Sequence, residues 1–223
     1  MAISDKTDIY NVAVSLLGDS ALQLTGASTV DNTDTKATRA FNLHYDPTLN
    51  ELVRQHTWNC CINRDQLITS AWSEHGWEYY SALPSGTLRA LALTNTDSSY
   101  VSLQYKVDWV VEGANILTNY SDPYLTFLKI PSIGAMDPMF LQALYYMVAI
   151  KMAIPITGDR KIRAELLTEL LGSILPEAKR IDGFEGNNEA AVESTWLNAT
   201  MSRGVESYYT GFESVPEPDF PWS

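Results

Sequence analysis

The spacing of apolar residues changes twice along the chain. Apolar residues recur three or four positions apart in residues 4–18 and 36–57, and again in residues 137–155 and 158–181. Between residues 58 and 130 they occur instead in short runs, rich in β-branched and aromatic residues and separated by Gly, Pro, Asn and Asp. The first spacing is typical of amphipathic helices and the second of short β strands. The pattern therefore predicts an α+β fold in which helices are followed by an inserted β lobe and then by further helices.

Capping residues set the expected starts of the first two helices. Ser4 or Asp5 can cap the first, and Asp34 or Thr35 the second, because their side-chain oxygens can accept hydrogen bonds from the free amides of a first turn. Pro47 falls inside the second helix, where a proline removes a hydrogen bond and clashes with the preceding turn. We therefore expect either a kink at Pro47 or two abutting helices.

The two later helices are expected to differ in burial. One begins at Asp137, is apolar on nearly all sides and ends at Pro155, so we expect a buried core helix rather than a membrane span. The other begins at Gly158 or Asp159 and is expected to kink at Pro176. Together with the first two, these helices predict a bundle of about four long helices.

Six short runs in the middle of the chain predict a small antiparallel sheet or sandwich of about five or six strands. Turn residues separate these runs, which are residues 66–72, 77–83, 88–94, 100–111, 115–120 and 124–130. Because this segment has the period of strands, it should fold apart from the helical core. The predicted parts are a helical domain of residues 1–60 and 131–182, an inserted β lobe of residues 61–130, and an extended C-terminal tail of residues 183–223.

The clearest hairpin signal is the run "WVVEGANILTNY", residues 109–120. Apolar β-branched residues lead into it and out of it, and Gly113 and Asn115 supply the turn. The run carries no candidate catalytic residue. Trp109, Glu112 and Gly113 become candidate interface residues through the family resemblance described below.

Charge narrows the classes of partner. The chain of 223 residues has a net charge of −12 and a pI near 4.6. Binding to DNA, RNA or an anionic membrane by charge attraction requires clustered Lys and Arg, so these partners are disfavoured. The first residues lack the apolar core of a signal peptide, which predicts synthesis in the cytosol.

The predicted tail combines negative charge with aromatic residues. Residues 183–223 contain seven acidic residues and one Arg. A solvated disordered tail is usually poor in aromatic residues, whereas isolated aromatics on an extended chain can anchor in pockets of another surface. Two roles are open: docking on a partner or a neighbouring subunit, and folding back on its own domain. The candidate anchors are Trp196, Tyr208, Tyr209, Phe212, Phe220 and Trp222.

No cofactor or metal site is predicted. The chain has neither of the common Gly-rich phosphate-binding motifs. His56 lies four residues before Cys60, but a zinc site needs further ligands, so a buried pair of thiols, Cys60 and Cys61, is the better interpretation. Neighbouring residues on a strand point to opposite faces, so we expect no structural disulfide between them.

An alternative function depends on the aromatic residues of the run "SAWSEHGWEYY", residues 70–80. An aromatic platform could bind a sugar, and Glu74 and Glu78 could act on a glycoside. However, nothing in this run places two carboxylates at a catalytic distance, and Trp72 and Trp77 are more typical of a sheet core or an interface. We therefore favour a protein that works by shape and contacts, with a carbohydrate-binding or carbohydrate-active protein as the alternative.

Several runs, taken in order, resemble the tail tubular protein A family of short-tailed bacteriophages and its head-to-tail adaptor relatives. They cover nearly the whole chain, and the ordered set is more specific than any one run. Two positions depart from the family pattern: Cys60 stands where an aromatic residue is usual, and Pro47 stands where a helix usually continues. The runs are "AVSLLGDSALQLTGAS", "FNLHYDPTLNELVRQHTWN", "NRDQL", "WEYYSALPSGTLRAL", "WVVEGANILTN", "MDPMFLQALYYMVAIKMA", "EAKRIDG" and "STWLNATMSRG".

This resemblance implies a structural protein of the virion that forms a ring of about twelve copies. The ring would bind the portal on one side and a tail nozzle or tail tube protein on the other. DNA would pass through its channel without tight binding, since a channel lined by negative charge repels phosphate. The β lobe would face the next tail component, and the tail would reach the portal or a neighbouring subunit. The family implies neither an enzymatic activity nor a cofactor.

Overall fold

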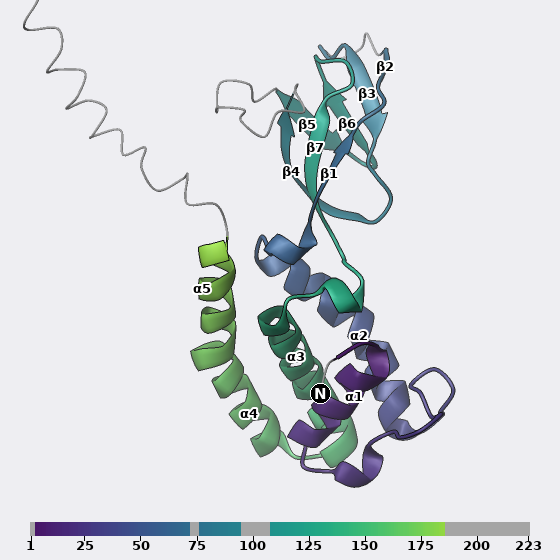
Figure 1. Cartoon of the computed structure of the whole chain (residues 1–223), viewed down its shortest axis with the longest axis vertical. Helices are drawn as coiled ribbons and strands as arrows, with labels where there is room; N and C mark the ends of the chain where they lie inside the picture. Colours follow the sequence, from purple (N-terminus) through teal and green to yellow (C-terminus); the bar gives the residue numbers. More distant parts are fainter. Residues whose placement is uncertain (1–2, 72–75, 95–107, 186–223) are drawn as a thin grey trace, which may run out of the picture. The chain divides into compact units, whose positions relative to one another are not determined.

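The computed structural model describes residues 3–71, 76–94 and 108–185, all of which belong to one compact unit, residues 1–185 (Figure 1). The fold is mixed α+β, as the apolar pattern predicts. The helices are α1 (Lys6–Leu16), α2 (Lys36–Gln55), α3 (Pro138–Thr157), α4 (Arg160–Glu169) and α5 (Leu175–Glu185), with a π-helical segment (Leu170–Ile174) joining the last two. Short 3-10 turns occur at Ser20–Leu22, Asn59–Cys61 and Ile133–Ala135.

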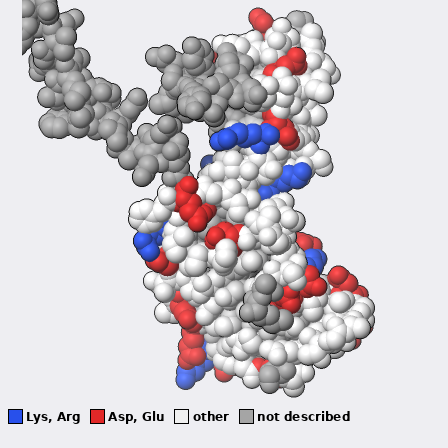
Figure 2. Space-filling model, viewed as in Figure 1, with Lys and Arg blue, Asp and Glu red and all other residues white. Residues whose placement is uncertain are grey.

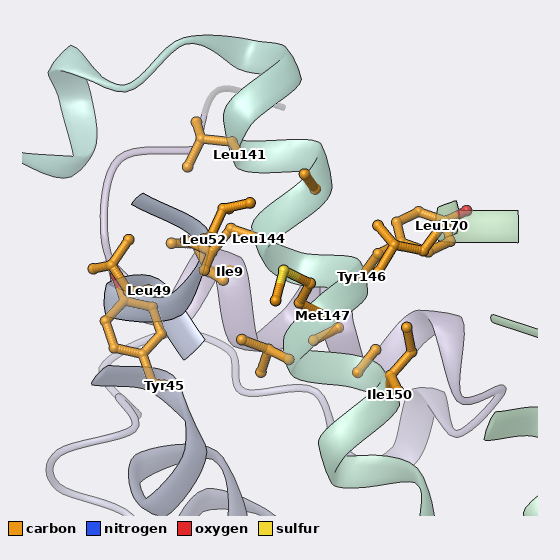
Figure 3. Packing of buried hydrophobic residues seen from close by; sticks show 14 of the residues in the cluster. Ile9, Tyr45, Leu49, Leu52, Leu141, Leu144, Tyr146, Met147, Ile150 and Leu170 are labelled. Atoms are coloured by element: carbon orange, nitrogen blue, oxygen red, sulfur yellow. The ribbon is translucent and has the colours of Figure 1, made fainter. Parts of the chain in front are cut away.

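Helix α3 is the centre of the helical part. It packs against α1 and α2 and also against α4, the π-helical segment and α5, so in Figure 1 it lies between the two groups. Its side chains point both ways: Leu144 lies near Leu52 of α2, and Tyr146 lies near Leu170 of the π-helical segment (Figure 3). This explains why α3 is apolar on nearly all sides. A bundle of four long helices is not confirmed, because α1 has only 11 residues and the last helical stretch is irregular.

The predicted N-terminal caps of α1 and α2 are confirmed. Asp5, rather than Ser4, caps α1, and its carboxylate accepts hydrogen bonds from the amides of Thr7 and Asp8. Thr35, rather than Asp34, caps α2. Such caps satisfy amides that have no partner inside the helix.

The predictions based on prolines are wrong in two respects: α2 is not divided into two abutting helices at Pro47, and α3 does not end at Pro155. Helix α2 is one helix of 20 residues that continues through Pro47, and α3 continues past Pro155 to end at Gly158, whose φ is +71°. A proline inside a helix costs about 3 kcal/mol. Tyr45 and Leu49, on either side of Pro47, are both buried in the helical core, and the free energy of this burial offsets the cost.

The β lobe consists of two small antiparallel sheets, which confirms the predicted class of β structure. One sheet has the order β1-β7-β4 and the other the order β2-β3-β6-β5. Both contribute to a second hydrophobic core, in which Leu93 and Phe127 of the first sheet meet Ile116 of the second. The strands are β1 (Ile62–Gln66), β2 (Ser70–Ala71), β3 (Tyr79–Ala82), β4 (Thr87–Thr94), β5 (Trp109–Glu112), β6 (Asn115–Thr118) and β7 (Tyr124–Lys129).

Strand β1 was not predicted. Its sequence, "INRDQ", is polar because β1 lies at the edge of its sheet, with only β7 beside it, and its last three residues are exposed. The strand predicted over residues 66–72 is therefore divided: Gln66 ends β1, and Ser70–Ala71 forms the short β2. Residues 100–107 of another predicted strand lie outside the described residues.

The first sheet also joins the lobe to the helices. Leu128 of β7 belongs to the helical core, and Ile62, Leu88 and Ile130 pack against that core. Strand β7 thus contributes Phe127 to one core and its neighbour Leu128 to the other, as the alternation of side chains along a strand requires.

A polar joint connects α5 to the end of α2. Asp182 is 7% exposed; its carboxylate accepts a hydrogen bond from the Asn59 amide (2.9 Å) and lies 3.0 Å from His56 Nε2. Asn59 Nδ2 donates in turn to the Asp182 carbonyl oxygen at 2.6 Å. The ring of Trp58 packs edge-on against His56 and Phe140, and its Nε1 donates to the Leu52 carbonyl oxygen at 2.8 Å.

The two cysteines lie in the 3-10 turn of this joint, just after α2, with Cys61 buried and Cys60 half-buried. Both are free thiols, with their Sγ atoms 3.8 Å apart. The pKa of Cys60 is lowered, mainly because the Cys61 thiol donates a hydrogen bond to it, and the same bond together with burial raises the pKa of Cys61.

Candidate docking surface

The β lobe has two ends with different roles. At one end, which we call the root, the chain enters at Ile62 and leaves at Lys129, and Thr87 pairs with Lys129. At the other end, which we call the free end, β1 finishes at Gln66 opposite Tyr124. Among the described residues, 67–69, 76–78 and 119–122 lie in loops at the free end, where the Glu78 amide donates to Asn119 Oδ1.

The predicted hairpin exists, and its turn lies on the root side of the lobe. Glu112 pairs with Asn115, and Gly113 has a φ of +61°, which Gly adopts without steric cost. The amide of Leu83, which begins the short connection from β3 to β4, donates to the Ala114 carbonyl oxygen at 2.9 Å. Because β4 begins at the root, the turn of the hairpin lies there as well. A partner at the free end would therefore not meet this turn first.

The three predicted hairpin residues have different environments. Trp109 is half-buried and packs against the core of the β lobe, so part of its role is structural. Glu112 and Gly113 are exposed and remain candidates for an interface.

The free end is held by a pair of hydrogen-bonded loops. The amide and the hydroxyl of Thr69 both donate to the Asp122 carboxylate, at 3.0 and 3.1 Å, and the Asp122 amide donates back to the Thr69 hydroxyl at 3.1 Å. Asp122 has a φ of +47°, an uncommon value for a residue other than Gly. Leu67, directly after β1, is buried, and its amide donates to the Pro123 carbonyl oxygen at 2.8 Å. These contacts fix both loops to the sheet.

The same contacts turn an apolar side chain outward. With Leu67 in the core and Thr69 bonded to Asp122, Ile68 points into solvent and is 87% exposed. Tyr120, in the second loop, is 42% exposed. We call residues 67–69 and 119–122 the free-end surface. A rigid surface with exposed apolar side chains is suited to protein contacts.

Sequence reasoning missed Ile68 for a physical reason. The residue fell inside a predicted strand, and the contact between Thr69 and Asp122 joins positions far apart in the chain, which local periodicity cannot reveal. The one available signal was the turn pair Asp122–Pro123.

The remaining predicted site residues are only partly covered. Trp196, Tyr208, Tyr209, Phe212, Phe220 and Trp222 lie outside the described residues, as do Trp72, Glu74 and His75 of the aromatic run. Within that run, Trp77 and Tyr79 are half-buried and Glu78 is exposed. The tail predicted from residue 183 overlaps α5, which continues to Glu185.

The chemistry of the described residues offers little for a metal. They contain no group of three His, Cys, Asp or Glu side chains that could hold a metal ion. His56, which the sequence places near Cys60, bonds to Asp182 instead.

Helix α3 is long and apolar enough to cross a membrane by length and composition alone. Of its most apolar window, 61% is buried inside the protein, and core helices of soluble proteins commonly meet the same criterion. The chain matches no protein-family model and no curated protein sequence.

Proposed function

We propose that this chain is a structural protein of a bacteriophage virion, an adaptor that joins the portal to the next component of the tail. Two observations support the proposal: the ordered resemblance to head-to-tail adaptors, and a β lobe inserted between α2 and α3 whose free end presents Ile68 on a loop that Asp122 holds in place. The second observation is the main support. Because its neighbours are already fixed, an exposed apolar side chain at this position loses little conformational entropy when a partner binds.

In the proposed assembly, about twelve copies form a ring in the neck of the virion after synthesis in the host cytoplasm. The helical parts pack side by side as a bundle around a channel through which DNA passes during ejection. The net charge of −12 disfavours tight binding of that DNA. The free-end surface meets the tail nozzle or tail tube protein, and residues 183–223 reach the portal or a neighbouring subunit.

Replacing Ile68 by Glu should weaken binding of the tail partner by about tenfold or more, since a charge then faces an apolar contact. The side chain is 87% exposed, so the free energy of unfolding should change by less than about 0.5 kcal/mol. Binding is measured by interferometry against the products of neighbouring genes. Leu43→Glu is the matched control, because Leu43 is 69% exposed on α2 and lies outside the free-end surface. Equal binding by I68E and wild type would remove the free-end surface from the proposal.

Deleting residues 212–223 should leave the melting temperature of the isolated subunit nearly unchanged. The same deletion should weaken attachment to the portal or to a neighbouring subunit, because burial of one Trp or Phe side chain is worth about 1.5–3 kcal/mol. Calorimetry and a portal-binding assay measure the two effects. A truncated chain that unfolds would assign Phe220 and Trp222 to the subunit's own core.

The carbohydrate alternative has weaker support. Trp77 and Tyr79 are half-buried rather than displayed as an open platform. A glycan-array screen tests it, and specific binding lost in a Trp77→Ala variant would favour it over the adaptor.

A further inference from the structure

One stripe on the outer side of α4 and the π-helical segment carries apolar and basic side chains, while Glu165 and Glu169 lie beside it and are paired with Lys161 and Tyr146. Leu167 and Leu171 are 40% and 57% exposed. Arg160 and Arg163 precede them at spacings of three and four residues, so all four side chains follow one stripe of the helix. Neither Arg forms an ion pair or side-chain hydrogen bond with the described residues. We call this stripe the α4 ridge.

A groove lies beside α1 and has the opposite character. It has a volume of about 750 Å³ and lies between α1, the loop of residues 23–29 and Tyr145 of α3. Its lining includes the carboxylates of Asp5 and Asp8 and no Lys or Arg, together with the apolar side chains of Ile3, Val12 and Leu24. We call it the α1 groove.

The α1 groove is formed in advance of any partner. Asn11 Nδ2 donates to the Leu24 carbonyl oxygen at 2.8 Å, and the Leu24 amide donates to Asn11 Oδ1 at 2.8 Å, so the loop is fixed to α1. The Asp8 carboxylate accepts from the Ser4 amide at 2.8 Å, which is the largest cause of its lowered pKa. Asp8 therefore stays charged at neutral pH.

The two surfaces are built on different helices of the same chain. Helix α3 packs against both α1 and α4, and it contributes Tyr145 to the α1 groove (Figure 1). Uncharged atoms make up most of the face shown in Figure 2, so local charges of opposite sign can determine which surfaces meet.

We propose that the α4 ridge of one copy docks in the α1 groove of a second copy. The leucines would pack on Ile3, Val12 and Leu24, while the arginines would face Asp5 and Asp8. Because different surfaces meet, the contact is head-to-tail and can be repeated from copy to copy. Closure of this repeat into a ring rests on the proposed function, whereas the contact between two copies does not.

The test uses two charge variants of the full chain, each made at exposed residues whose side chains have no bonds to the described chain. Arg160→Glu/Arg163→Glu changes the α4 ridge, and Thr25→Arg/Ser28→Arg changes the α1 groove without touching the caps of α1. Sedimentation velocity of wild type at low salt should show association that increases with concentration. Each variant should associate at least about tenfold more weakly than wild type, because like charges then meet at the contact.

Mixing the two variants separates a head-to-tail contact from a symmetric one. The ridge variant keeps an intact groove and the groove variant an intact ridge, so the mixture should associate more tightly than either variant does alone. The matched control, Arg64→Glu/Arg89→Glu in the β lobe, should associate as wild type does.

The inference is overturned if either variant associates like wild type, or if wild type is monomeric at every concentration. If the chain is monomeric alone but forms a ring with the portal, the inference is overturned and the proposed adaptor function stands. If copies associate head-to-tail but do not bind the portal, the inference stands and the adaptor function is contradicted.

Discussion

Replacing Trp58 by Ala is expected to lower the free energy of unfolding by about 3–5 kcal/mol. Trp58 is 1% exposed and lies where the end of α2, the start of α3 and the polar joint meet. Its removal leaves a large cavity beside Phe140, and it also leaves the Leu52 carbonyl oxygen without the bond from Nε1. Both effects act on the same core, so the loss should be among the largest for any single residue.

Urea unfolding followed by circular dichroism measures this loss. Trp58→Phe is the matched control, because it keeps an aromatic ring against Phe140 and removes only the indole hydrogen bond and part of the volume. It should cost about 1–2 kcal/mol. A Trp58→Ala variant as stable as Trp58→Phe would show that the ring does not hold the helical core together.

Replacing Asp182 by Ala is expected to cost about 3 kcal/mol. The change leaves the Asn59 amide, and the facing nitrogen of His56, without an acceptor in a half-buried site. Helix α5 should then open locally before the rest of the protein unfolds, because this joint is its polar attachment to the end of α2.

Asp182→Asn is the control for this joint. The amide oxygen can still accept from the Asn59 backbone, and its NH₂ group can donate to a neutral His56, so we expect less than half of the loss. Hydrogen exchange of the amides in α5, measured by mass spectrometry, reports local opening directly. Equal exchange in the wild type and the Ala variant would show that α5 is held by its apolar contacts alone.

Local chemistry was predictable from the sequence. Asp5, Thr35 and Asp137 cap helices because their side chains reach amides two or three residues away, and Gly113 turns a hairpin because its φ is positive. Such signals depend on a few neighbouring residues. They do not require knowledge of what packs against the segment.

The predictions that failed concern features that depend on residues far apart in the sequence. The helix through Pro47 persists because Tyr45 and Leu49, on either side of the proline, are buried in the helical core, and the polar β1 is a strand because β7 pairs with it. The exposure of Ile68 depends on Thr69 bonding to Asp122, more than fifty positions away in the chain. The hairpin was predicted correctly, but only the pairing of the strands reveals that its turn lies at the root and not at the free end.

The central claim is that this chain forms an adaptor ring between a portal and a tail component. Electron microscopy of the full chain mixed with the proteins encoded by its neighbouring genes tests it most directly. The account predicts a closed ring of about twelve copies stacked on the portal, with the free ends of the β lobes directed toward the tail component. Single unassociated subunits in the presence of the portal, or a ring that contacts the portal through Ile68 and the free-end surface, would contradict it.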